Sequence, residues 1–192
     1  MKIKLGASAL LMSLALTTLT GCGMTDSEDS RTSESSGNAD NADGSNDVPD
    51  AGTSNTQDAA DEAERVSSEL YDLIGVEGVA SDTGPGVSEC GDKDPEKYFR
   101  IFHAWTFTPA SADRLDGVME RLRTQLPGQG WKVVAYGPDT SRNKNLSLTA
   151  DNDGKKYSVK IAHFAKDATP NLNLMVVSGC YRVPEGETVD RF

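Results

Sequence analysis

Two stretches of the chain repeat their apolar residues at the spacing of an amphipathic helix. In residues 58–74 the apolar side chains return every three to four positions, and Gly75 ends the pattern. A second stretch covers residues 109–126, where Thr108 is the expected N-cap and Pro109 suits the first turn. The apolar stripes are Ala59, Ala63, Val66, Leu70 and Ile74 in the first stretch, and Leu115, Val118, Met119, Leu122 and Leu126 in the second. The sequence therefore predicts two helices, each with one apolar face.

Other stretches alternate apolar and polar residues, which is the pattern of a half-buried strand. Five such strands are expected, at residues 98–107, 130–136, 144–150, 156–164 and 171–183. The last strand contains Leu174-Met175-Val176-Val177, which is apolar on both faces and so indicates a central position in the sheet. Asn152-Asp153-Gly154 favours a hairpin turn between the third and fourth strands. Residues 75–97 are rich in glycine, proline and aspartate, and we expect a loop there.

The order of these elements is a helix, a strand, a helix and four strands, which predicts an α+β fold. We expect a largely antiparallel five-stranded sheet with two helices packed on one face. The length of this part of the chain suits one globular domain, at residues 58–192.

The first residues have the order of charge and apolarity of a secretory signal. Lys2 and Lys4 precede an uncharged, mostly apolar run from Leu5 to Leu19. This run is shorter than the roughly 20 residues that a membrane-spanning helix needs. We therefore interpret residues 1–21 as a signal peptide that is removed on export.

The signal ends in Leu19-Thr20-Gly21-Cys22, which resembles the bacterial lipobox. The resemblance implies that the Cys22 thiol receives a diacylglyceryl group, that a peptidase cuts after Gly21, and that a fatty acid such as palmitate acylates the freed amine. Each buried lipid CH₂ contributes about 0.8 kcal/mol, so two acyl chains anchor a protein stably. The expected location is the extracytoplasmic face of the cell membrane, with the lipid on Cys22 as the anchor.

Residues 22–57 have almost no large apolar side chain after the lipidated cysteine. Such a segment buries too little surface to offset the entropy of ordering it, so we expect a disordered acidic tether. The whole chain carries a net charge of −11. Because this charge repels nucleic acid, nucleic acid is not an expected partner.

The chain has three cysteines, and lipidation of Cys22 would leave Cys90 and Cys180. An exported compartment permits disulfides, and a remainder of two cysteines fits one bridge. We therefore predict a Cys90–Cys180 disulfide that ties the loop to the last strand, with the two Cα atoms about 4.4–6.8 Å apart. Two free buried thiols are the alternative. A zinc site is disfavoured because there is no CxxC motif and only two histidines are present.

The remaining candidates for chemistry each have a simpler interpretation. His103 and His163 fall on strand faces shared with apolar residues, which favours packed, hydrogen-bonded histidines. Ser88 lacks the glycine two residues later that a nucleophile elbow requires. Asp151-Asn152-Asp153-Gly154 is only a fragment of a calcium loop. The sequence assigns no catalytic, cofactor-binding or metal-binding residue.

Several further segments together resemble the small uncharacterised lipoproteins of actinobacteria. Besides the lipobox and the polar tether, they are Asp82-Thr83-Gly84-Pro85-Gly86, Glu89-Cys90-Gly91, Leu126–Val134 and Ser178-Gly179-Cys180-Tyr181-Arg182. The resemblance covers nearly the whole chain, and only the lipobox within it has a specific function. It implies no activity for named residues.

These observations favour a membrane-anchored, non-enzymatic binding or accessory module that acts on an envelope protein or ligand. An envelope hydrolase whose site is assembled from scattered residues is the alternative. A third hypothesis is a purely structural envelope protein. A polar-lined cleft with a histidine beside a carboxylate would favour an enzyme, and a flat surface would favour the structural hypothesis.

Overall fold

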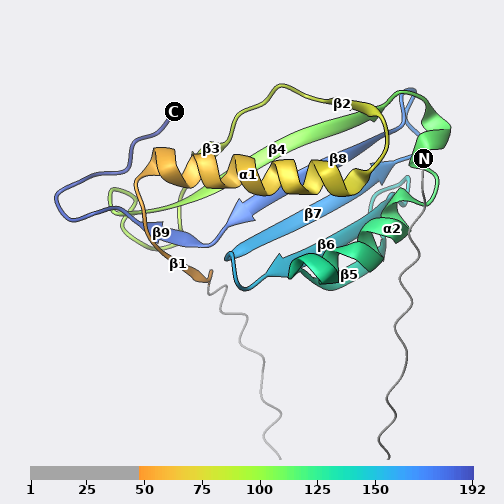
Figure 1. Cartoon of the computed structure of the whole chain (residues 1–192). Coiled ribbons are helices and arrows are strands. Elements are labelled where there is room, and N and C mark those ends of the chain that lie inside the picture. Colours follow the sequence, from red (N-terminus) through yellow and green to blue (C-terminus); the bar gives the residue numbers. More distant parts are fainter. Residues whose placement is uncertain (1–47) are drawn as a thin grey trace, which may run out of the picture. The chain divides into compact units, whose positions relative to one another are not determined.

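A computed structural model of the chain describes residues 48–192 (Figure 1). The expected signal peptide, the lipobox with Cys22 and most of the expected tether lie outside the described residues. The last part of that tether does not: residues 50–57 form a first strand and the start of a helix. The ordered domain therefore begins earlier than residue 58.

The described residues form a sheet of nine strands, not the expected five. Its main strands follow the order β1-β9-β4-β8-β7-β6-β5, and β2 and β3 pair with β4 outside this path. The strands are β1 (Asp50–Thr53), β2 (Gly78–Ala80), β3 (Gly86–Ser88), β4 (Tyr98–Pro109), β5 (Lys132–Pro138), β6 (Leu146–Asn152), β7 (Tyr157–Phe164), β8 (Asn171–Ser178) and β9 (Cys180–Arg182). All pairs are antiparallel except β1 with β9, so the sheet is mixed.

The prediction of a central last strand is confirmed for its first part, because β8 lies between β4 and β7. The predicted strand 171–183 is nevertheless divided at Gly179 into β8 and β9. A Cβ atom on Gly179 would lie 2.4 Å from the carbonyl oxygen of Pro49. The backbone amide of Cys180 donates to that same oxygen at 2.7 Å. The strand therefore breaks where the segment leading into β1 joins the sheet.

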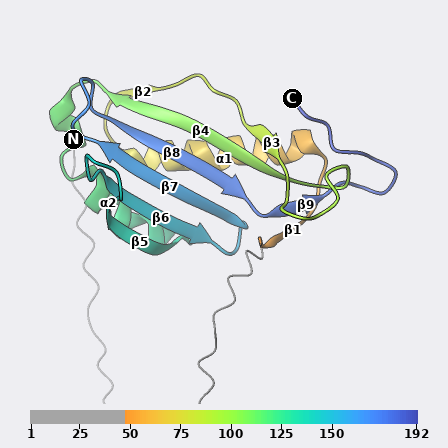
Figure 2. The same ribbon diagram turned by 180° about the vertical axis from the view of Figure 1, so that it is seen from behind.

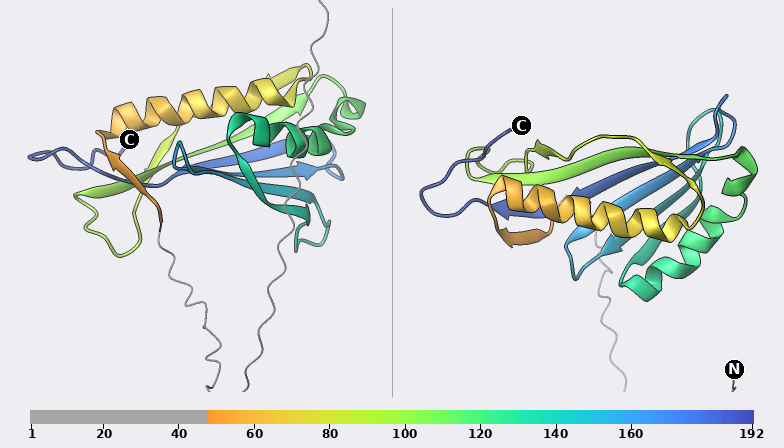
Figure 3. Two further views of the ribbon diagram at one scale, coloured as in Figure 1. Left: turned by 60° about the horizontal axis from the view of Figure 1, so that its bottom comes forward. Right: turned by 45° about the horizontal axis from the view of Figure 1, so that its top comes forward.

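Both helices cover the same face of the sheet, as expected (Figure 3). Helix α1 (Thr56–Ile74) packs on β4 and β8, and α2 (Val118–Gln125) packs on β6. The sheet curls toward them, and Figure 2 shows its other face without a helix in the described part of the chain. The helices and the concave face of the sheet enclose one core.

The apolar stripes expected from the sequence form this core. Every residue of both stripes is at most 2% exposed. The core face of β4 adds Phe99, Ile101, Trp105 and Phe107 at alternate positions. Burying a side chain of this size contributes about 1.5–3 kcal/mol, so the core dominates the stability of the domain.

The ends of α1 are defined by local contacts. Asn55 is the N-cap, and its side-chain oxygen accepts a hydrogen bond from the backbone amide of Asp58 at 2.8 Å. Gly75 is the C-cap in the left-handed conformation, with φ of 63°. The Arg121 guanidinium donates to the carbonyl oxygen of Ile74, which satisfies one of the free carbonyls at this end.

The expectation of one helix at 109–126 is wrong at its start. Pro109 is the last residue of β4, and Thr108 is also in that strand rather than an N-cap. A short 3-10 helix, η1 (Ala112–Leu115), comes first, and Gly117 with φ of 72° separates it from α2. A second 3-10 helix, η2 (Leu126–Gln129), follows α2 and contains Pro127. The apolar stripe is continuous, but the left-handed glycine interrupts the backbone.

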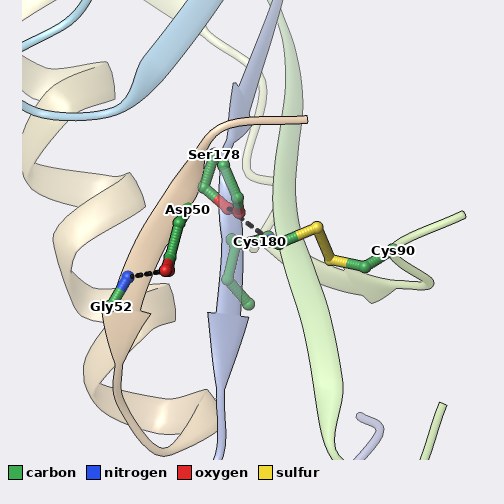
Figure 4. Close-up of a disulfide and its surroundings, with 7 residues drawn as sticks. Asp50, Gly52, Cys90, Ser178 and Cys180 are labelled. Atoms are coloured by element: carbon green, nitrogen blue, oxygen red, sulfur yellow. Dashed lines mark hydrogen bonds between the residues drawn. A yellow bond between two sulfur atoms is a disulfide. The ribbon is translucent and has the colours of Figure 1, made fainter. Parts of the chain in front are cut away.

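The predicted disulfide between Cys90 and Cys180 is present, with a Cα–Cα distance of 5.8 Å (Figure 4). Cys90 follows β3 and Cys180 begins β9, so the bridge ties the loop before β4 to the last strand. Both cysteines are at most 4% exposed. The loop expected at 75–97 also contains β2 and β3, which pair with β4.

Candidate functional site

A cleft of about 440 Å³ lies between α1, β4 and the segment that links β2 to β3. In Figure 1 this segment arches beside α1 along the edge of β4. Helix α1 contributes Glu64, Ser67, Ser68, Tyr71 and Asp72 to the lining. The end of β2, the linking segment and β4 contribute Ala80, Ser81, Thr83, His103 and Trp105. The volume is within the range of about 300–1,000 Å³ that is usual for small-molecule sites.

The five residues from α1 share one side of the helix because they are spaced three, four, seven and eight positions from Glu64. This side lies next to the buried stripe that contains Ala63, Val66 and Leu70. Ser67 is on the border between the two and is 5% exposed. In the sequence, the cleft shows only as polar residues next to the apolar stripe. Periodicity alone does not distinguish such residues from the ordinary solvent-facing side of a helix.

His103 is at the floor of the cleft and is 8% exposed. Its Nε2 lies 2.6 Å from the carbonyl oxygen of Thr83, and its Nδ1 lies 2.9 Å from Oγ of Ser67. A carbonyl oxygen can only accept, so Nε2 carries a proton and donates. In the neutral imidazole, Nδ1 then accepts from the Ser67 hydroxyl. The expectation of a packed, hydrogen-bonded His103 is confirmed.

Two aromatic side chains form the apolar part of the cleft. The ring centroids of Tyr71 and Trp105 are 6.3 Å apart, and Tyr71 also meets Phe107 edge-on at 5.8 Å. The Tyr71 hydroxyl donates to the carbonyl oxygen of Gly78 at 3.2 Å, which fixes the ring. Trp105 is 4% exposed, and its indole Nε1 has no hydrogen-bond partner within the described part of the chain. A buried donor without an acceptor is unusual in a native fold.

The charge in the cleft is entirely negative. Glu64 and Asp72 line it, and no lysine or arginine does. Neither carboxylate forms an ion pair with any residue in the range 48–192. Eight positions separate them on α1, so their Cα atoms are roughly 12 Å apart along the helix axis. The two negative charges therefore mark opposite ends of the cleft.

The segment that links β2 to β3 forms the outer wall of the cleft and is held to β4 by one backbone hydrogen bond and two side-chain hydrogen bonds. The backbone amide of Ser81 donates to the Thr106 carbonyl at 2.8 Å, and the Thr106 amide donates to Oγ of Ser81 at 3.0 Å. The Thr83 hydroxyl donates to the carbonyl oxygen of Ala104 at 2.8 Å. These bonds set the width of the cleft between α1 and the wall.

The other candidates from the sequence lie outside the cleft. His163 is on β7, where burial lowers the pKa of its imidazole and nearby Asp116 partly offsets that shift. Ser88 is the last residue of β3. The turn after Asn152 is a hairpin, in which the side chain of Asn152 accepts from the Lys155 amide at 2.9 Å. Over residues 48–192 no group of three or more acidic, histidine or cysteine side chains is placed to hold a metal ion.

Within the described residues, neither helix is both long and apolar enough to cross a bilayer. No family model, no curated protein and no solved structure matches this chain.

Proposed function

We propose that this chain is a lipoprotein held at the extracytoplasmic face of the cell membrane by the lipid on Cys22, and that its domain is a non-enzymatic binding module. The binding site is the cleft between α1, β4 and the wall that links β2 to β3. The observation that carries this proposal is the convergence of Tyr71, Trp105 and several polar groups on one cleft.

The chemistry of the cleft suits binding better than catalysis. Ligand sites combine apolar walls with a few placed polar groups, and here the aromatic rings lie beside the hydroxyls of Ser68, Ser81 and Thr83. The most buried polar pair, Ser67 and His103, already satisfies its own hydrogen bonds within the fold. A structural envelope protein would not need a cleft of this composition. The expected signal peptide and lipobox support the location.

Fluorescence tests the binding site, because the chain has only two tryptophans and one of them lines the cleft. Trp131→Phe leaves Trp105 as the only indole. We expect at least one chromatographic fraction of low-molecular-mass envelope extract to change the Trp105 emission saturably. Ser68→Phe fills the cleft from an exposed position and abolishes this change, whereas Thr188→Phe, also at an exposed position, leaves it intact.

Two outcomes contradict the binding module. In the first, no fraction alters the emission of the variant that retains Trp105. In the second, the response survives Ser68→Phe, so the ligand binds elsewhere. The anchor has a separate test, which is labelling with a fatty-acid analogue, described in the Discussion.

Acyl hydrolysis is a second candidate function, favoured by the distance of 2.9 Å between Oγ of Ser67 and Nδ1 of His103. A serine next to a histidine that a third group orients is the arrangement of an activated nucleophile. It is the weaker candidate because Ser67 lies inside α1, where backbone amides bond to preceding carbonyls and cannot stabilise an oxyanion. Hydrolysis of a fluorogenic ester that Ser67→Ala abolishes and Ser68→Ala preserves would establish it.

A further inference from the structure

The two ends of the cleft carry the same charge. Glu64 and Asp72 extend from one side of α1, roughly 12 Å apart along the axis. Two other acidic residues of this helix have cationic partners: Glu62 pairs with Arg65, and Glu69 pairs with Lys155. Asp58 and Asp61 accept hydrogen bonds from the amide side chains of Asn55 and Gln57. Glu64 and Asp72 have neither kind of partner among residues 48–192. The cleft therefore presents two unpaired negative charges at a defined separation, which two positive charges of a ligand would match.

The surface between these ends is aromatic. Tyr71 and Trp105 line it side by side, and rings of this kind attract cations to their faces and accommodate methylene chains on them. His103 lies beside these rings, and its two ring nitrogens are already bonded to Ser67 and Thr83. A ligand with cationic ends and a chain between them matches both features.

We propose that the ligand is a linear dicationic amine. One ammonium group pairs with Glu64 and the other with Asp72, and the chain lies along Tyr71 and Trp105. This inference rests on the proposed binding function and specifies its ligand class.

Isothermal titration calorimetry of the mature chain tests the charges with four probes of eight carbon atoms each: α,ω-diaminooctane, octylamine, octanediol and suberate. We expect the diamine to bind at least threefold more tightly than octylamine, with no measurable binding of the diol or of suberate. Glu64→Gln and Asp72→Asn should each weaken the diamine about three- to fivefold, the range of a solvent-accessible ion pair. Added salt should weaken it as well.

A control variant neutralises two other exposed carboxylates, Glu185→Gln with Asp167→Asn, and so changes the net charge by twice as much as either cleft variant. This double variant should bind the diamine as the unaltered chain does. A comparable loss in the control would show that only the overall negative charge attracts the diamine, and this would overturn the inference.

The probes separate this inference from the proposed function. If octanediol or suberate binds as well as the diamine and Ser68→Phe abolishes that binding, the cleft is a binding site but its ligand is not a dication. If no probe binds, the dicationic ligand is refuted, and the proposed function is decided by the fluorescence of Trp105 with extract fractions.

Discussion

Removing the Cys90–Cys180 disulfide should strongly destabilise the domain without changing its fold. The bridge joins residues 90 positions apart. In the chain-entropy account, a closed loop of this size lowers the stability of the unfolded state by about 4.6 kcal/mol, and measured losses on removal are about 2–5 kcal/mol. Both cysteines are nearly fully buried. We therefore choose the double substitution Cys90→Ala with Cys180→Ala, which places no unsatisfied hydroxyl in the interior.

Urea unfolding of the chain from residue 23 onward, followed by circular dichroism, measures this loss. The free energy of unfolding should fall by about 3–5 kcal/mol. The m-value should rise because the unfolded chain without the bridge exposes more surface. Reduction of the unaltered chain is the matched control and should give the same change. A loss below about 1 kcal/mol with an unchanged m-value would refute the view that the bridge acts by constraining the unfolded chain.

Three further predictions concern single positions. Gly179→Ala should lower the free energy of unfolding by about 1–3 kcal/mol, because the added Cβ would lie 2.4 Å from the carbonyl oxygen of Pro49. Gly137→Ala is the control and should lower it less, because no atom lies within 4 Å of that Cβ. Equal losses in the two variants would contradict this explanation. Because burial lowers the pKa of His163 in the folded chain, the unfolded chain binds the proton more readily. Stability should therefore fall as the pH drops from above 6.5 toward that lowered pKa, and His163→Gln should flatten this part of the pH profile of urea unfolding; an unchanged profile would exclude His163 as the cause. Cys22→Ala should abolish both incorporation of a fatty-acid analogue and retention in the membrane fraction, and retention of an unlabelled, correctly processed variant would refute the lipid anchor.

The elements with a long apolar pattern could be predicted from the sequence. The stripe from Ala59 to Ile74 and the alternation in β4 are local signals, because a helix or strand of this length must bury one face whatever it packs against. The Cys90–Cys180 bridge was equally predictable, since only two cysteines remain once Cys22 is assigned to the lipid. The lipobox is a signal of the same local kind, and the anchor stays a prediction.

The short elements could not be predicted in this way. Strands β1, β2 and β3 have only three or four residues each, too few to show a period, and their pairing with β9 or β4 defines them. The break before α2 was missed because the apolar stripe continues across Gly117, while the φ of 72° at that residue is a backbone property.

The cleft was decided by tertiary structure alone. Ser67 and His103 are 36 residues apart in the chain, and their contact exists only because α1 packs on β4. The apolar periodicity of the chain was enough to predict that α1 has one apolar side and that β4 presents His103 and Trp105 on its buried face. It did not determine which polar residues of the helix would meet that face, because this depends on the rotation and position of the helix over the sheet. Those are set by the packing of the whole core, to which distant residues contribute as much as the residues of the cleft.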